Sequence, residues 1–248
     1  MEKSKIYDNL PSTGLSKITS FLKLKPTTVE KPLKDFGYHT LINKDREATN
    51  AIDVVAVHGL DGHYEKSWQD ENTGVNWLTD LIPTGYFRVL SFSYNSSVKF
   101  SKSVCDLYDF ADQLLEGLFA ARQSDEEKQR PIIFICHSFG GIVFEQAYIR
   151  AHEVERYKNL AKLIRSVLFF GTPHRGSSLA SWGTMLSSIL KTASFGTSTN
   201  TQLPKDLETT SRDLDRITQC FKNKSSDLAI YSFYETEKMD FMKNVVSS

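Results

Sequence analysis

The sequence predicts an α/β fold, in which a mostly parallel sheet is covered on both faces by helices. Two observations support this prediction. Short apolar runs of strand length alternate along the chain with segments of helical periodicity, and such alternation is typical of parallel sheets with crossover helices. Residues 131–143 read as a buried strand, a tight turn and the start of a helix, in that order. The 248 residues of the chain are enough for one domain of this class with a large core.

Each element follows from a local pattern. The apolar runs predict five strands, at residues 52–57, 87–92, 132–136, 163–170 and 228–234. Helices are expected between them, at residues 76–82, 103–122 and 206–222, and after Ser138. The helix at 103–122 has the clearest signal, because its apolar residues recur on one face. Pro83 ends the helix before it, and the charged residues 124–130 are expected to form a loop.

Two segments stand apart from this alternation. Residues 1–35 are expected to be a flexible N-terminal leader before the α/β domain of residues 36–248. Within the leader, residues 14–25 are basic and weakly amphipathic, so peripheral contact with a membrane surface stays open as an alternative. Residues 178–226 are polar and rich in Ser and Thr. We expect them to form a lid or cap-like insertion.

The composition narrows the classes of partner. The 30 Lys and Arg residues balance the 30 Asp and Glu residues, so no overall field recruits nucleic acid. The three cysteines, Cys105, Cys136 and Cys220, have neither disulfide-framework nor metal-ligand spacing. We expect no signal peptide and no membrane-spanning segment. The expected location is intracellular, most simply cytoplasmic, with mitochondrial or ER-membrane association left open.

Ser138 is the strongest candidate for a functional residue. The pattern Cys136-x-Ser138-x-Gly140 lies where a strand turns sharply into a helix, which holds the serine hydroxyl away from the backbone. The helix that follows directs its first N–H groups toward any negative charge that develops there. These features are typical of a nucleophile elbow, although Cys136 stands where glycine is usual. The alternative is a glycine-rich connection whose serine only caps the helix.

A second motif follows the first predicted strand of the domain. Residues 58–63 read His-Gly-Leu-Asp-Gly-His, and glycines in such a loop allow close approach of the backbone. The tetrahedral intermediate of acyl transfer needs two fixed donors for its negative oxygen. The candidates are the N–H groups of Leu60 and Phe139. His58 and His63 could instead bind a metal, but no third ligand has suitable spacing, so neither metal nor cofactor is expected.

These motifs occur in an order that resembles a known family. The ordered set is Val57 to His63, Trp68, Asn76 to Leu78, Phe92 to Tyr94, His137 to Gly141 and Phe170 to Gly176. Over residues 36–240 the chain resembles the lipase-like serine esterases of the α/β-hydrolase superfamily. These include serine-active-site-containing proteins, relatives of the GPI-inositol deacylases, and N-terminal hydrolase domains of fungal nucleotide-binding receptor-like proteins. The resemblance implies hydrolysis or transfer of an acyl ester, often on a lipid.

The resemblance also implies a Ser, acid and His triad, in that order along the chain. Ser138 matches the nucleophile, and Glu235, at the end of the last predicted strand, is the best candidate acid, with Asp240 weaker. No histidine follows His174. In the family this histidine belongs to a turn that shapes the pocket. Here it is a candidate substitute base. The expected pocket also includes His58, Gly59, Gly62, His137, Gly140, Thr172 and Pro173.

Two functions therefore stay open. One is a serine hydrolase of lipid-like esters. The other is a catalytically inactive binding or signalling module on the same scaffold, or the N-terminal fragment of a longer receptor-like protein. In the family, one further strand and then the triad histidine follow this position. We therefore expect the sheet of this chain to be incomplete at its C-terminal edge. Residues 228–234 would then offer an unpaired edge to a protein partner or to a missing segment.

Overall fold

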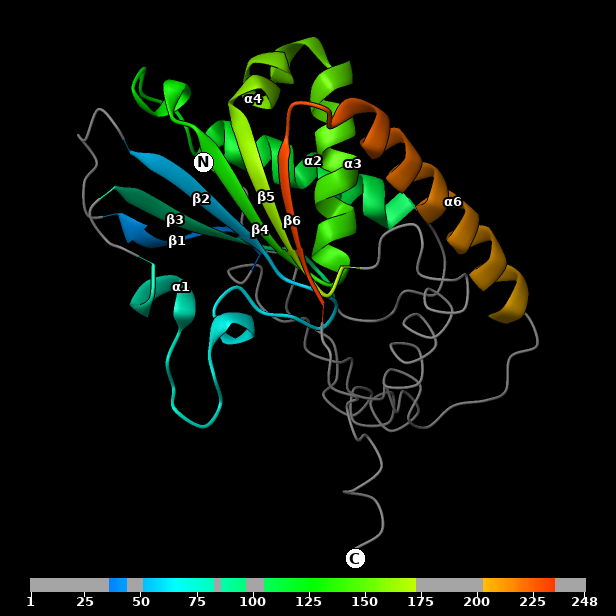
Figure 1. The fold of residues 1–248 in the computed structure, drawn as a ribbon, viewed down its shortest axis with the longest axis horizontal. Helices are drawn as coiled ribbons and strands as arrows, with labels where there is room; N and C mark the ends of the chain where they lie inside the picture. Colours follow the sequence, from blue (N-terminus) through cyan, green and yellow to red (C-terminus); the bar gives the residue numbers. More distant parts are fainter. Residues whose placement is uncertain (1–35, 44–50, 83–85, 97–104, 173–202, 235–248) are drawn as a thin grey trace, which may run out of the picture. The chain divides into compact units, whose positions relative to one another are not determined.

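The computed structural model describes residues 36–43, 51–82, 86–96, 105–172 and 203–234, and its central feature is a six-stranded sheet (Figure 1). The strand order is β1-β3-β2-β4-β5-β6, with β1 antiparallel to β3 and the other neighbours parallel. The strands are β1 Gly37–Asn43, β2 Ile52–Val57, β3 Phe87–Ser93, β4 Ile132–His137, β5 Ile164–Phe170 and β6 Ala229–Phe233. The α-helices are α1 Trp77–Asp80, α2 Cys105–Ala120, α3 Phe139–Glu153, α4 Lys158–Leu163 and α6 Leu203–Lys224.

The five predicted strands and the four predicted helices are confirmed, with boundaries that move by a few residues. Of these strands and α-helices, two were not predicted. Strand β1 has one fully buried residue, Ile42, so it lacks the apolar run that identifies a buried strand. Helix α4 has six residues, too few to show a helical period.

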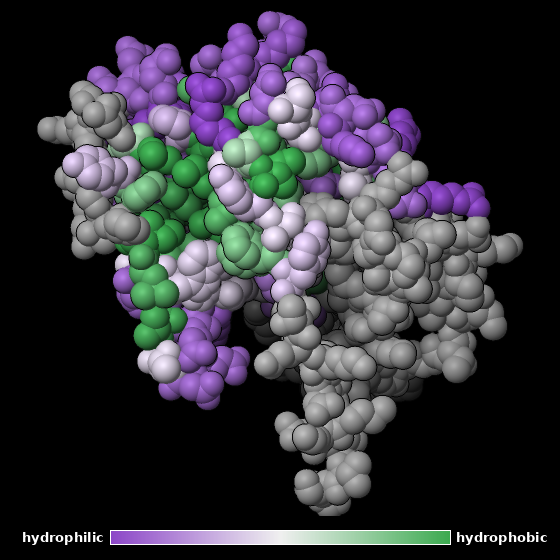
Figure 2. All heavy atoms as spheres, in the orientation of Figure 1, coloured by the Kyte–Doolittle hydropathy of each residue, from purple (hydrophilic) through white to green (hydrophobic). Residues whose placement is uncertain are grey.

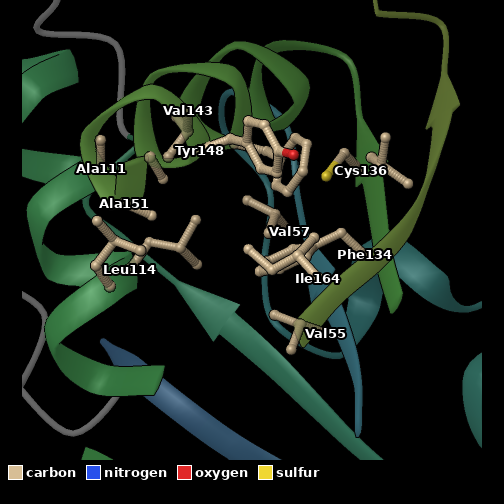
Figure 3. Close-up of a cluster of buried hydrophobic side chains, with 14 of the residues drawn as sticks. Val55, Val57, Ala111, Leu114, Phe134, Cys136, Val143, Tyr148, Ala151 and Ile164 are labelled. Carbon is tan, nitrogen blue, oxygen red and sulfur yellow. The ribbon is translucent and has the colours of Figure 1, made fainter. Parts of the chain in front are cut away.

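Four helices bury one face of the sheet in the main hydrophobic core. Alternate residues of each strand point to this face, and the inward set includes Val55, Val57, Phe134 and Cys136. Figure 3 shows these side chains opposite Val143, Tyr148 and Ala151 of α3 and Ala111 and Leu114 of α2. The predicted burial of Cys136 is confirmed, because its thiol lies in this core and burial raises its pKa well above the usual value.

The opposite face of the sheet has a smaller apolar cluster. Trp68 and Leu78, from the loop around α1, cover Val54, Ala56 and Ile135. Toward β6 this cover thins, and Tyr231 and Phe233 are 55% and 47% exposed. Figure 2 shows apolar residues at the surface in this view of the sheet.

Helix α6 belongs to the main core, which corrects part of the expected lid at residues 178–226. Its residues Leu214, Ile217 and Phe221 are buried and recur at helical spacing on one face, which packs on α3. The Thr218 hydroxyl also donates a hydrogen bond of 3.0 Å to the buried carboxylate of Glu145 on α3. Residues 178–202 of the expected lid lie outside the described residues.

A cluster of buried charges ties together the amino ends of the central strands. The Asp53 carboxylate on β2 accepts hydrogen bonds from Arg88 of β3, at 2.8 and 2.7 Å, and from Arg122 after α2. Arg88 also donates to Glu127, at 2.7 Å. Glu127 and Arg130 are 7% and 3% exposed. The predicted loop of residues 124–130 is therefore partly buried. This cluster lies at the sheet end opposite Ser138.

Strand β6 is the last strand in the order of the described sheet. Among the described strands it pairs with β5 alone, and all five of its residues are exposed. The Gly171 N–H donates to Phe233 O at 2.9 Å, so the Phe233 peptide groups face β5. Because this direction alternates along a strand, the peptide groups of Ile230 and Ser232 face the open edge. The seven residues 228–234 carry no charge, which leaves this edge without the usual protection against pairing.

We therefore expect this chain to self-associate through β6, and a lysine at the edge to oppose it. Sedimentation velocity over a concentration series should show wild-type association that Ser232→Lys reduces, since an edge lysine disfavours strand pairing. Ser226→Lys, the same change at an exposed position outside the strand, should associate like the wild type. A wild-type chain that stays monomeric at every concentration would contradict this expectation.

Candidate active site

Ser138 occupies the sharp turn between β4 and α3. Its backbone has φ 50° and ψ −123°, a left-handed conformation that costs a non-glycine residue about 1–3 kcal/mol. Three hydrogen bonds hold it there: the Ser138 N–H donates to Phe170 O at 2.8 Å, and the Ser138 carbonyl accepts from Thr172 Oγ1 at 3.0 Å and from the Gly141 N–H at 3.1 Å. The side chain is half-buried. The expected strand, turn and helix are therefore present, with the serine at the turn.

The loop after β2 touches this turn with no room for a side chain between them. A Cβ added to Gly140 would lie 2.4 Å from His58 O and 2.5 Å from Val57 O. A Cβ added to Gly59 would lie 3.0 Å from Ser138 Cβ. The two predicted motifs, which are far apart in the sequence, thus meet at the serine.

His58 lies beneath the loop instead of lining a pocket. Its side chain is fully buried, with Nδ1 2.8 Å from Gly59 O and Nε2 3.4 Å from Ser93 Oγ. Its ring stacks on the Tyr94 ring at 4.7 Å and 4°. Burial lowers the pKa of His58 to about 4, so the ring is neutral at physiological pH. The expected pocket includes His58, but its side chain is fully buried beneath the loop, so any contribution it makes to a pocket comes through its backbone.

The remaining residues of this loop turn tightly around His58. A Cβ on Gly62 would lie 2.5 Å from His58 Nδ1, so only glycine fits there. Asp61 has a positive φ of 52°, and its N–H donates to Ser96 O at 3.2 Å. Leu60 is half-buried and packs against the main core. The loop is therefore compact, with the Leu60 backbone one residue from the contact between Gly59 and Ser138.

The other predicted site residues divide into two groups. Thr172 is buried, and its hydroxyl donates a hydrogen bond to the Ser138 carbonyl. His137 is exposed at the end of β4. Pro173, His174, Glu235 and Asp240 lie outside the described residues.

None of the five histidines that the structure describes hydrogen-bonds the Ser138 hydroxyl. His152, fourteen residues along α3 from Ser138, lies about 20 Å away, since a helix rises about 1.5 Å per residue.

Two further observations concern ligands and membranes. Within the described ranges, no three His, Cys, Asp or Glu side chains gather as metal ligands. None of the helices in these ranges combines the length and apolar character needed to cross a bilayer.

The family follows from comparison with known proteins. The model of a family described as "Putative serine esterase (DUF676)" matches residues 51–239, which include β2, the loop around Gly59, Ser138 and β6. The chain belongs to this family. The resemblance inferred from the ordered motifs is thereby confirmed.

Curated relatives and a solved structure are also similar to this chain. Protein SERAC1 of Bos taurus is 24% identical over 208 residues, which are 74% of this chain and 30% of the relative. Protein SERAC1 of Homo sapiens is 26% identical over 162 residues, 56% of this chain and 24% of the relative. The chain thus spans less than a third of either relative. The mature Bacillus licheniformis lipase BlEst2 has a TM-score of 0.50 at 19% identity, over 79% of this chain and 70% of the lipase. This likeness confirms the α/β-hydrolase fold.

The strain at Ser138 can be measured by comparing two substitutions. Ser138→Gly should be more stable than Ser138→Ala by about 1 kcal/mol, because glycine adopts the positive φ without steric cost. Chemical denaturation of both variants measures the difference. At Ser232, in ordinary strand conformation, the order should reverse, since glycine weakens a strand. Equal stability of the two Ser138 variants would contradict a strained turn.

The buried neutral His58 should make the fold sensitive to mild acid. The unfolded chain binds this proton with a pKa near 6.5 and the folded chain only near 4. Unfolding therefore takes up a proton between these values, and the free energy of unfolding should fall by about 3 kcal/mol as the pH drops from 6.5 to 4. Urea denaturation at a series of pH values measures this slope. His58→Asn should flatten it, and an equal slope in that variant would contradict the assignment to His58.

Proposed function

We propose that this protein is a serine hydrolase that cleaves carboxylic esters, including lipid-like esters, through an acyl-enzyme on Ser138. One observation carries the proposal: the strained turn holds Ser138 directly against the glycine loop after β2, with a Cβ on Gly59 reaching within 3.0 Å of Ser138 Cβ. Membership of the serine esterase family supports the same reaction class.

In the proposed reaction Ser138 Oγ attacks the ester carbonyl carbon and passes its proton to a general base. The carbonyl oxygen becomes negative in the tetrahedral intermediate, and two backbone N–H donors stabilise it. One is Phe139, the first residue of α3, where the helix end favours negative charge. The other is Leu60. The alcohol then leaves with a proton, and water hydrolyses the acyl-serine to free the acid and restore Ser138.

The candidate base and acid belong to segments that leave the sheet beside Ser138. The Gly171 N–H donates to Phe233 O at 2.9 Å, so the ends of β5 and β6 are joined. Phe170, one residue earlier, accepts the Ser138 N–H. The segment leading to His174 and the segment leading to Glu235 thus begin next to the turn. We propose His174 as the base to test first and Glu235 as the acid that orients the base.

A specific observation favours a second candidate function. No hydrogen bond joins the described histidines to the Ser138 hydroxyl, and a serine hydrolase that lacks its base loses on the order of 10⁶ in turnover. If His174 does not supply the base, the same scaffold would serve as a binding or signalling module without catalysis.

Labelling with a fluorophosphonate, which reacts with activated serines, separates the two functions. The wild-type chain should be labelled, Ser138→Ala should not, and His174→Ala should be labelled much more slowly because the base is lost. Circular dichroism and thermal melting confirm that each variant is folded. Turnover of p-nitrophenyl esters of increasing chain length then tests the preference for lipid-like acyl groups. A folded wild-type chain that is not labelled would overturn the proposed hydrolase and favour the binding module.

A further inference from the structure

We infer that Tyr94 is a positioning residue that fixes the oxyanion loop, the loop of residues 58–62, through both the backbone and the ring of His58. Tyr94 directly follows β3, the neighbour of β2 in the sheet, and is 1% exposed. The catalytic consequence of this role rests on the proposed function, whereas the positioning itself does not.

The first contact holds the His58 backbone. The Tyr94 hydroxyl donates a hydrogen bond of 2.9 Å to His58 O, and burial raises the pKa of Tyr94 well above its usual value, so the hydroxyl keeps its proton. On α3, Gly140 approaches the same carbonyl so closely that a Cβ would lie 2.4 Å away. The His58 carbonyl is therefore held by Tyr94 and has no room to move toward α3.

The second contact holds the His58 ring. Gly59 O can only accept a hydrogen bond, so His58 Nδ1, 2.8 Å away, must carry the proton. In the neutral ring Nε2 is then an acceptor, and it faces the Ser93 hydroxyl at 3.4 Å. The Tyr94 ring, stacked on the imidazole at 4.7 Å and 4°, keeps the ring in the plane that these two contacts require.

The ring contact acts together with the Gly62 N–H, which donates to the same Gly59 O at 3.2 Å, to direct the proposed oxyanion donor. The carbonyl of Gly59 and the N–H of Leu60 belong to one planar peptide unit and point in opposite directions. When His58 Nδ1 holds the Gly59 carbonyl on the buried side, the Leu60 N–H must point to the other side. Tyr94 thus acts on Leu60 through His58. The oxyanion loop contains two glycines, and these contacts fix the direction of its Leu60 N–H.

The chain offers a matched control for removing one hydroxyl. Tyr38 donates a similar hydrogen bond, 3.0 Å long, to Leu114 O, and the rings of Tyr38 and Tyr94 both pack on Phe92, at 5.2 and 5.8 Å. Tyr38→Phe and Tyr94→Phe therefore each lose one bond from a tyrosine hydroxyl to a backbone carbonyl, and should lower the thermal midpoint by similar amounts. Among the described residues, no hydrogen bond or ring contact joins Tyr38 to the oxyanion loop.

The experiment measures loop order and serine reactivity on both variants of the full chain. Hydrogen exchange of the amides at residues 59–62 should be faster in Tyr94→Phe than in the wild type and unchanged in Tyr38→Phe. Fluorophosphonate labelling of Ser138 should slow about fivefold or more in Tyr94→Phe, which corresponds to the loss of one buried hydrogen bond, and should be unchanged in Tyr38→Phe. With p-nitrophenyl acetate, kcat should fall while KM changes little.

The outcomes separate this inference from the proposed function. Equal exchange at residues 59–62 in the two variants would overturn the positioning role. Faster exchange in Tyr94→Phe with unchanged labelling would overturn its link to catalysis. If the wild-type chain is not labelled at all, the proposed hydrolase fails, and the exchange comparison still decides whether Tyr94 positions the loop.

Discussion

The close contact between the start of α3 and the end of β2 is the constraint on which the site depends. Gly140 lies against the carbonyls of Val57 and His58 with no space for a Cβ. This contact brings Gly59 against Ser138, although 79 positions separate them in the sequence. The backbone strain at Ser138 is offset by its hydrogen bonds to Phe170, Thr172 and Gly141 and by the packing of α3 into the core.

The sheet provides the rigidity that this contact needs. At the carboxyl ends of β4 and β5, side-chain and backbone hydrogen bonds connect the serine turn to Phe170 and Thr172. At the amino ends, the carboxylate of Asp53 binds Arg88 and Arg122 in a buried cluster. Removing one partner from such a cluster is costly, so both ends of the central strands are firmly held. A site held in this way can keep its donors oriented before the substrate arrives.

The sequence predicts those parts of the structure that depend on local pattern. Apolar runs mark the central strands, and the residues around Ser138 mark the turn, because strand, turn and helix follow one another directly. The edge strand β1 could not be predicted, because Ile42 is its one buried residue. The bonds from Arg88 to Asp53 and from Tyr94 to His58 could not be predicted either, because they join residues 35 and 36 positions apart. Only the register of neighbouring strands brings such residues together.

The most direct test of the central claim is a crystal structure of the chain after reaction with a phosphonate ester. We expect the phosphorus bonded to Ser138 Oγ, with one phosphonyl oxygen about 2.7–3.1 Å from the backbone nitrogens of both Phe139 and Leu60. This arrangement would show that the loop after β2 and the start of α3 form one oxyanion hole. A phosphonyl oxygen that points to solvent, or that contacts neither nitrogen, would contradict the claim that this contact builds a catalytic site.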